Sequence, residues 1–131
     1  MRTENKNTIL IVEDDLIIAM DEKIALEEYG YDVLTAKSGE AAIEIMRGNH
    51  QVDLILMDID LGTGIDGIAT AETILRFREI PIAFLSSRTV LEIAEKTAKI
   101  SLYGYIVKNS GIKEINALIK KVLSSLDAER E

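Results

Sequence analysis

Short apolar runs alternate with longer amphipathic stretches along the chain. The runs are rich in β-branched residues, which is typical of strands, and they cover Ile9–Val12, Asp32–Ala36, Leu54–Met57, Pro81–Leu85 and Tyr103–Val107. The first, third and fourth are nearly unbroken, as in strands that are buried on both faces. The stretches between and after them predict helices at Leu16–Tyr29, Ser38–Arg47, Asp66–Arg78, Thr89–Lys99 and Ile112–Leu126.

Five repeats of strand and helix predict an α/β fold, because single helices connect parallel strands through right-handed crossovers. The expected architecture is a doubly wound, open sheet of five parallel strands. Such sheets bind ligands beyond the carboxyl ends of their strands. We expect one domain at residues 8–126, after a polar lead at 1–7 and before a tail or the start of a linker at 127–131.

Composition excludes several functions. A formal net charge of -8 argues against a nucleic-acid surface, which would be basic. The chain has no cysteine, so a disulfide framework or a thiolate metal site is excluded. The apolar run Ile9–Val12 is far too short to cross a membrane, and residues 1–7 lack the apolar core of a signal peptide. We therefore expect a cytoplasmic location and no direct contact with nucleic acid or membrane.

Reactive side chains follow four of the predicted strands. They are Glu13, Asp14 and Asp15 after the first, Asp58 and Asp60 at the third, Ser86 and Ser87 at the fourth, and Lys108 at the fifth. Each has an ordinary explanation as a cap, turn or surface residue. Because the carboxyl ends of parallel strands share one edge of the sheet, their coincidence there favours a functional site instead.

These residue types suit phosphoryl transfer. Crowded carboxylates repel one another unless a cation lies among them, and Mg²⁺ prefers such oxygen ligands and also binds phosphate oxygens. A carboxylate that keeps one oxygen available can attack an activated phosphoryl donor. A metal ion, a hydroxyl and an ammonium would then neutralise the phosphoryl oxygens.

Five segments, in this order, resemble the receiver domain of two-component response regulators: Ile9–Asp15, Leu56–Ile59, Asp66–Gly67, Pro81–Ser87 and Gly104–Lys108. The resemblance implies a flavodoxin-like (CheY-like) (βα)5 fold with strand order 2-1-3-4-5. It also implies a domain that takes a phosphoryl group from a sensor histidine kinase and is not a turnover enzyme.

The resemblance assigns a role to each acid of the site. Asp58 would be the phosphorylated residue. Asp14 would bind Mg²⁺ directly and Glu13 would bind it through water. The backbone carbonyl of Asp60 would provide a further ligand.

It also assigns residues that contact or respond to the phosphoryl group. Ser86 matches the hydroxyl that moves toward the phosphoryl group, and Lys108 matches the ammonium that pairs with a phosphoryl oxygen. Tyr105 matches the aromatic residue that changes rotamer when the hydroxyl moves. Asp60 and Arg88 match positions that overhang the phosphoryl group, and we expect the two side chains to pair and tune its lifetime.

The chain departs from the family pattern in two loops. Asn109 follows Lys108 where the family usually has proline after a cis bond, so we predict a trans bond because a non-proline cis bond costs about 3 kcal/mol. The loop 61–65 is one residue longer than usual and rich in glycine. Glycines there permit positive φ, and we expect this loop to be mobile and to become ordered when a cation binds.

Three alternatives remain open. Asp58–Thr63 resembles the signature of haloacid-dehalogenase-type phosphatases, although that motif follows the first strand of their fold. Glu13 with Asp58 and Asp60 resembles a Toprim site, although the net charge is wrong for DNA. The third alternative is a receiver-like module that acts without phosphorylation.

If the chain is a receiver, we expect it to bind its partner through the face from Thr89 to Leu126. Its partner would be an output protein, a fused output domain or a second copy.

Overall fold

The computed structural model describes residues 6–62, 64–86, 104–107 and 111–130, and gives only the backbone for 86, 104–107 and 126–130. Its strands are β1 (Thr8–Val12), β2 (Asp32–Ala36), β3 (Leu54–Asp58), β4 (Ile82–Ser86) and β5 (Gly104–Val107). Its helices are α1 (Leu16–Glu28), α2 (Gly39–Arg47), α3 (Gly67–Leu75) and α5 (Ile112–Arg130). The helix predicted at Thr89–Lys99 lies outside the described residues.

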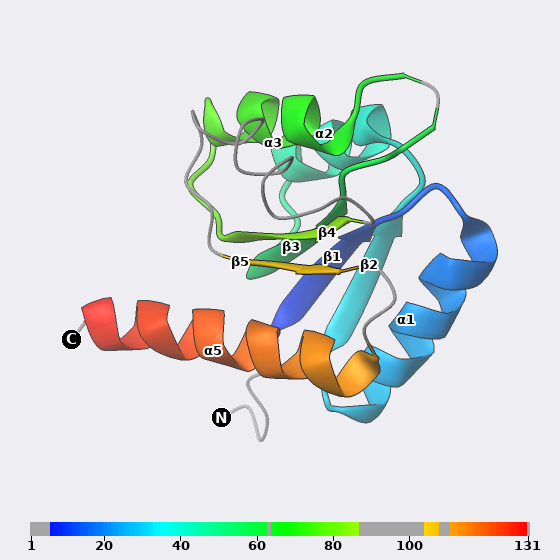
Figure 1. Cartoon of the computed structure of the whole chain (residues 1–131). Helices are drawn as coiled ribbons and strands as arrows, with labels where there is room; N and C mark the ends of the chain where they lie inside the picture. Colours follow the sequence, from blue (N-terminus) through cyan, green and yellow to red (C-terminus); the bar gives the residue numbers. More distant parts are fainter. Residues whose placement is uncertain (1–5, 63, 87–103, 108–110, 131) are drawn as a thin grey trace.

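The strands form one parallel sheet in the order β2-β1-β3-β4-β5, as predicted. Helices α2 and α3 cover one face of this sheet, and α1 and α5 cover the other (Figure 1). The fold class expected from the alternation of strands and helices is therefore confirmed. Strand order reverses between β1 and β3, which places the predicted ligand edge at the ends of these two strands.

Alternate residues of the central strands face opposite layers, which explains their unbroken apolar sequence. One core contains Leu10, Val12, Ile55, Met57 and Phe84 together with residues of α2 and α3. The other contains Ile9, Ile11, Leu54, Leu56 and Leu85 together with residues of α1 and α5. The two cores, one on each face of the sheet, together hold β1 and β3 rigidly in the middle of the domain.

Side-chain caps start three of the helices. Asp15 accepts hydrogen bonds from the backbone N–H groups of Ile17 and Ile18 at the start of α1. Ser38 caps α2 and Asp66 caps α3. These caps satisfy N–H groups that have no partner within the helix, so they fix where the chain turns after each strand.

Two predicted helix ends were wrong. The helix α3 stops at Leu75 instead of Arg78. The N–H groups of Arg76 and Phe77 bond only three residues back, to the carbonyls of Thr73 and Ile74, and the guanidinium of Arg78 donates hydrogen bonds to the carbonyls of Met46 and His50 at 3.2 and 3.1 Å. The helix α5 continues to Arg130, beyond the predicted end at Leu126. The described part contains no cis peptide bond, and the Lys108–Asn109 bond lies outside it.

Candidate functional site

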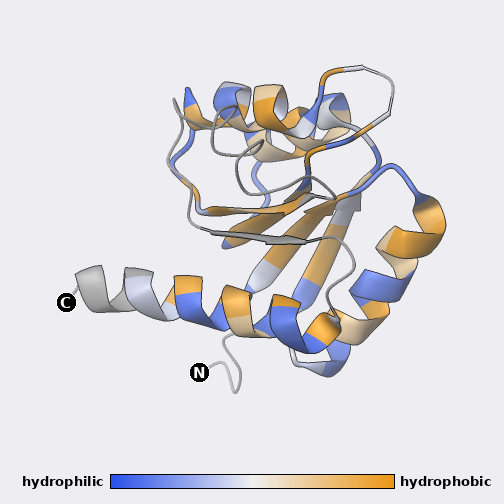
Figure 2. Cartoon of the chain, in the orientation of Figure 1, coloured by the Kyte–Doolittle hydropathy of each residue, from blue (hydrophilic) through white to orange (hydrophobic). Residues whose placement is uncertain are grey.

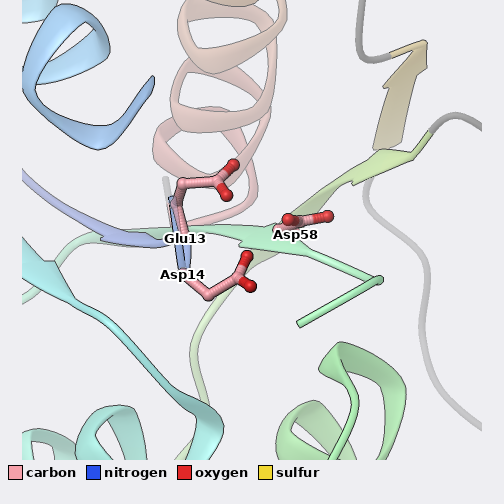
Figure 3. Close-up of side chains that lie close together, drawn as sticks. All are labelled: Glu13, Asp14 and Asp58. Atoms are coloured by element: carbon pink, nitrogen blue, oxygen red, sulfur yellow. The ribbon is translucent and has the colours of Figure 1, made fainter. Parts of the chain in front are cut away.

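Three carboxylates come together where β1 and β3 end side by side. Val12 pairs with Met57 in the sheet register, so the next residues of both strands, Glu13 and Asp58, emerge as neighbours. One carboxylate oxygen from each of Glu13, Asp14 and Asp58 lies within 4.8 Å of the other two. Figure 3 shows the three side chains gathered at these strand ends. Glu13, Asp14 and Asp58 therefore lie together at one edge of the sheet, as the order of the strands predicts.

Burial makes this cluster electrostatically unusual. Asp58 is 0% exposed and Glu13 is 2% exposed, whereas Asp14 is open to solvent. Carboxylates packed this closely repel one another, and a cation among them would offset that repulsion. Hard divalent cations accept such oxygen donors, and the exposed Asp14 leaves room for the waters that Mg²⁺ retains. The residues present therefore fit a metal ion.

Backbone N–H groups orient both buried acids. The N–H of Asp15 donates to Oε2 of Glu13 at 3.0 Å, and the N–H of Asp60 donates to Oδ1 of Asp58 at 3.1 Å. The N–H of Ile59 donates to the carbonyl of Leu85 at 3.0 Å. This last bond extends the β3–β4 ladder by one residue and fixes the backbone directly after Asp58.

The glycine-rich loop after Asp58 approaches the cluster closely. Gly62 has φ 72° and Gly64 has φ 85°, which confirms the predicted use of positive φ. A Cβ built on Gly62 would lie 2.8 Å from Oδ2 of Asp14. A side chain at this position would therefore collide with one of the three clustered acids. The predicted mobility of the loop, and its ordering by a cation, stay predictions.

The other predicted site residues are described in part or not at all. Ser86 ends β4 and Tyr105 lies within β5 opposite Phe84, but only the backbone of each is described. Asp60 is half-buried beside Asp58. Lys108 and Arg88 lie outside the described residues, so the proposed pairing of Asp60 with Arg88 stays a prediction.

Sequence reasoning gave no role to two residues beside the site. Gly67 begins α3, and a Cβ there would overlap the carbonyl oxygen of Asp58. Glu40, in the first turn of α2, accepts a hydrogen bond from the N–H of Ile65. The Asp66–Gly67 pair gave a weak signal, because a helix cap followed by glycine indicates a close approach. Glu40 gave none, because its contact lies 25 residues away along the chain.

A hollow of about 570 Å³ lies apart from this cluster, between the C-terminal ends of α2 and α3. It is lined in part by Arg47, His50, Phe77 and Arg78. The guanidinium of Arg47 lies 4.9 Å from the centre of the Phe77 ring. None of the clustered acids lines this hollow, so it is separate from the acidic cluster.

A doubly wound parallel sheet with an acidic, metal-compatible cluster at its switch point defines a flavodoxin-like domain built for phosphoryl or cation chemistry. Comparisons with known proteins give the family. The response regulator receiver domain matches residues 9–120. The chain therefore belongs to the response regulator receiver domain family, the phosphoacceptor domains of two-component systems.

Individual relatives are also response regulators or transcriptional regulatory proteins. The transcriptional regulatory protein ZraR of Escherichia coli is 30% identical over 97% of this chain and 29% of its own length. The N-terminal domain of a response regulator/sensory box/GGDEF 3-domain protein from Carboxydothermus hydrogenoformans is 38% identical, with a TM-score of 0.87 over 95% of this chain and 100% of that one. The response regulator TrrA of Thermotoga maritima, solved in complex with Mg²⁺-BeF, is 29% identical, with a TM-score of 0.76 over 88% and 98% of the two chains.

This chain spans only part of its curated relatives, from 29% of ZraR to 56% of the regulatory protein PdtaR of Mycobacterium tuberculosis. Receiver domains of response regulators interact with histidine kinases and with output domains, and they are not turnover enzymes in general. Among the described residues, no helix is long and apolar enough to cross a membrane.

Proposed function

We propose that Asp58 accepts a phosphoryl group from the phosphohistidine of a sensor histidine kinase in a reaction that depends on Mg²⁺. The observation that carries this proposal is the convergence of Glu13, Asp14 and Asp58 within 4.8 Å at the ends of β1 and β3. A carboxylate at such a place has a rigid strand behind it and two further acids beside it that can hold a cation. The Mg²⁺-BeF complex of the similar protein TrrA supports the same chemistry.

In the proposed step, a carboxylate oxygen of Asp58 forms a bond to phosphorus while the phosphorus–nitrogen bond of the phosphohistidine breaks. The electron pair of that bond goes to the imidazole, whose other nitrogen carries a proton, so neutral histidine leaves and an acyl phosphate remains. The N–H of Asp60, at 3.1 Å from Oδ1, holds the carboxylate in a fixed orientation for attack. Bound Mg²⁺ supplies the positive charge that offsets repulsion between the carboxylates and the phosphoryl oxygens.

For the metal ion, we assign Asp14 and Asp58 as direct ligands, together with the backbone carbonyl of Asp60. Glu13 is assigned a contact through water. Its Oε2 already accepts a hydrogen bond from the N–H of Asp15, and its burial leaves it little freedom to move toward the ion. Mg²⁺ retains several waters when it binds proteins, which is compatible with this mixed set of ligands.

The remaining roles rest on the family resemblance. Ser86 and Lys108 would contact phosphoryl oxygens, and Tyr105 would respond by changing rotamer. Asp60 and Arg88 would control how easily water reaches the acyl phosphate. Phosphorylation would shift the face formed by β5 and its flanking segments, which would then bind an output protein, a fused output domain or a second copy.

An apolar surface beside the acids supports contact with the kinase. Four large side chains of α1 are exposed to solvent: Leu16 71%, Ile17 75%, Met20 53% and Ile24 53%. Hydrophobic colour marks several turns of α1 in Figure 2, and the first turn of this helix closely follows the acidic end of β1. A phosphohistidine that reaches Asp58 must bring its carrier next to this helix. We therefore assign the exposed apolar stripe of α1 to docking of the kinase.

The proposal is tested by incubating the chain with acetyl phosphate and Mg²⁺ and locating the adduct by mass spectrometry. One phosphoryl group on Asp58 is expected, together with its loss in Asp58→Asn and its retention in Asp32→Asn. Asp32 is an exposed acid at the opposite end of the sheet, so it serves as the matched control. Absence of any adduct would favour a module that acts without phosphorylation, and continuous turnover of a phosphate ester would favour a phosphatase.

A further inference from the structure

The loop after the acceptor strand lies between two carboxylates that belong to different parts of the fold. At one end, Gly62 faces Oδ2 of Asp14, and a Cβ there would lie 2.8 Å from that oxygen. At the other end, the N–H of Ile65 donates a hydrogen bond to Oε2 of Glu40 at 3.3 Å. The loop is thus in contact with the acidic cluster and with the first turn of α2.

Glycine at position 64 makes the second contact possible. A Cβ built on Gly64 would lie 2.9 and 3.0 Å from the two carboxylate oxygens of Glu40. The backbone of the loop therefore lies directly against the Glu40 carboxylate. The φ of 85° at Gly64 is a conformation that residues with side chains rarely adopt, so both the geometry and the space at this point require glycine.

The start of α2 is itself fixed in place. Ser38 caps the helix by accepting a hydrogen bond from the N–H of Ala41 at 3.0 Å. Gly39 is packed so closely that a Cβ there would overlap Oγ1 of Thr70 on α3 and lie 2.8 Å from a side-chain carbon of Ile65. Glu40 is exposed to solvent, but it projects from a helix start that is held rigidly by these contacts.

We infer that Glu40 is a positioning residue for the metal site: by holding the backbone at Gly64 and Ile65, it sets how Gly62 lies against Asp14. This inference rests on the proposed function, in which Asp14 and the carbonyl of Asp60 bind Mg²⁺. A loop that is already held needs to lose less conformational freedom when the ion binds. Glu40 thus raises the affinity for Mg²⁺ although it contacts no ligand atom.

Three variants separate this role from its alternatives. Glu40→Ala removes the acceptor of the Ile65 hydrogen bond and the negative charge near the N-terminus of α2. Glu40→Gln removes the charge but keeps an acceptor oxygen, so it isolates the hydrogen bond from the helix-dipole effect. Glu44→Ala removes an acid one turn further along α2 and is the matched control.

Two measurements apply to each variant: the Mg²⁺ dissociation constant from calorimetry, and the hydrogen-exchange rate of the Ile65 amide without metal. In Glu40→Ala the dissociation constant should rise about threefold or more, and the amide should exchange about threefold or more faster, as expected for the loss of one hydrogen bond. Glu40→Gln and Glu44→Ala should both stay close to wild type.

The inference is overturned if Glu40→Ala binds Mg²⁺ as wild type does, whether or not exchange at Ile65 changes. Equal effects in Glu40→Gln and Glu40→Ala would also overturn it, because the charge would then act without the hydrogen bond. Failure of the proposed function looks different: wild type itself would bind no Mg²⁺ and gain no phosphoryl group. The exchange rate at Ile65 still reports on the Glu40 contact in that case.

Discussion

Replacement of Gly67 by alanine tests how tightly the start of α3 is packed against the acceptor strand. A Cβ at this position would overlap the carbonyl oxygen of Asp58 and would lie 2.8 Å from Cα of Ile59. Both neighbours are backbone atoms. They cannot move aside without disturbing two backbone hydrogen bonds. One runs from the N–H of Ile59 to the carbonyl of Leu85 at 3.0 Å, and the other from the N–H of Gly67 to the carbonyl of Ile59 at 2.9 Å.

The expected loss in the free energy of unfolding is about 2 kcal/mol. Overpacking a well-filled interior costs about 1–3 kcal/mol, and the upper end applies here because both neighbours are backbone atoms. Alanine reduces the freedom of the unfolded chain and returns about 0.4–1 kcal/mol. A domain of this size has a stability of about 5–15 kcal/mol, so the Gly67→Ala protein should still fold. Because the strain falls on the backbone of Asp58, its labelling by acetyl phosphate should also slow.

Urea unfolding at equilibrium measures the first effect, and mass spectrometry measures the second. Gly48→Ala is the matched control, because Gly48 ends α2 with φ -82° and the nearest atoms to a Cβ there lie at 3.4 Å. It should be more stable than wild type by about 0.4–1 kcal/mol, since both the space and the backbone conformation accept alanine. If Gly67→Ala proves as stable as Gly48→Ala, the packing argument is wrong.

Three further predictions concern other parts of the domain. Tyr31→Phe should lower the free energy of unfolding by about 1–3 kcal/mol in urea, because the Tyr31 hydroxyl donates to Oδ1 of the buried Asn116 at 2.7 Å. Burial raises the pKa of Tyr31. The contribution of its hydroxyl to the free energy of unfolding is therefore fully present below pH about 10 and is lost as pH rises through the folded pKa. Over that alkaline range the Tyr31→Phe variant should lose less stability than wild type. Gly62→Ala should weaken Mg²⁺ binding about threefold or more in calorimetry, because φ is 72° and the methyl group would press on Asp14; an unchanged dissociation constant would count against the described loop geometry. Ile17→Lys should slow transfer from a phosphorylated histidine kinase while labelling by acetyl phosphate stays normal, and equal slowing of both would disprove a docking role.

The sequence by itself determined the order of elements and the place of the chemistry. Residues of the central strands are apolar without interruption, and this pattern has few solutions other than a strand covered on both faces. Once the strands are known to be parallel, the residues that follow them must share an edge of the sheet. The grouping of Glu13, Asp14 and Asp58 follows from that rule and needed no knowledge of side-chain positions.

Only the tertiary structure decided which apolar residues are covered and which contacts hold the loop. Ile17 and Ile24 read as ordinary members of a helix, yet both are exposed, while Ala19 and Leu26 face the core. The end of α3 and the contact of Glu40 with Ile65 were also beyond prediction. Periodicity reports the conformation of neighbouring residues, whereas these features depend on groups that are distant in the chain and meet only after the layers have packed.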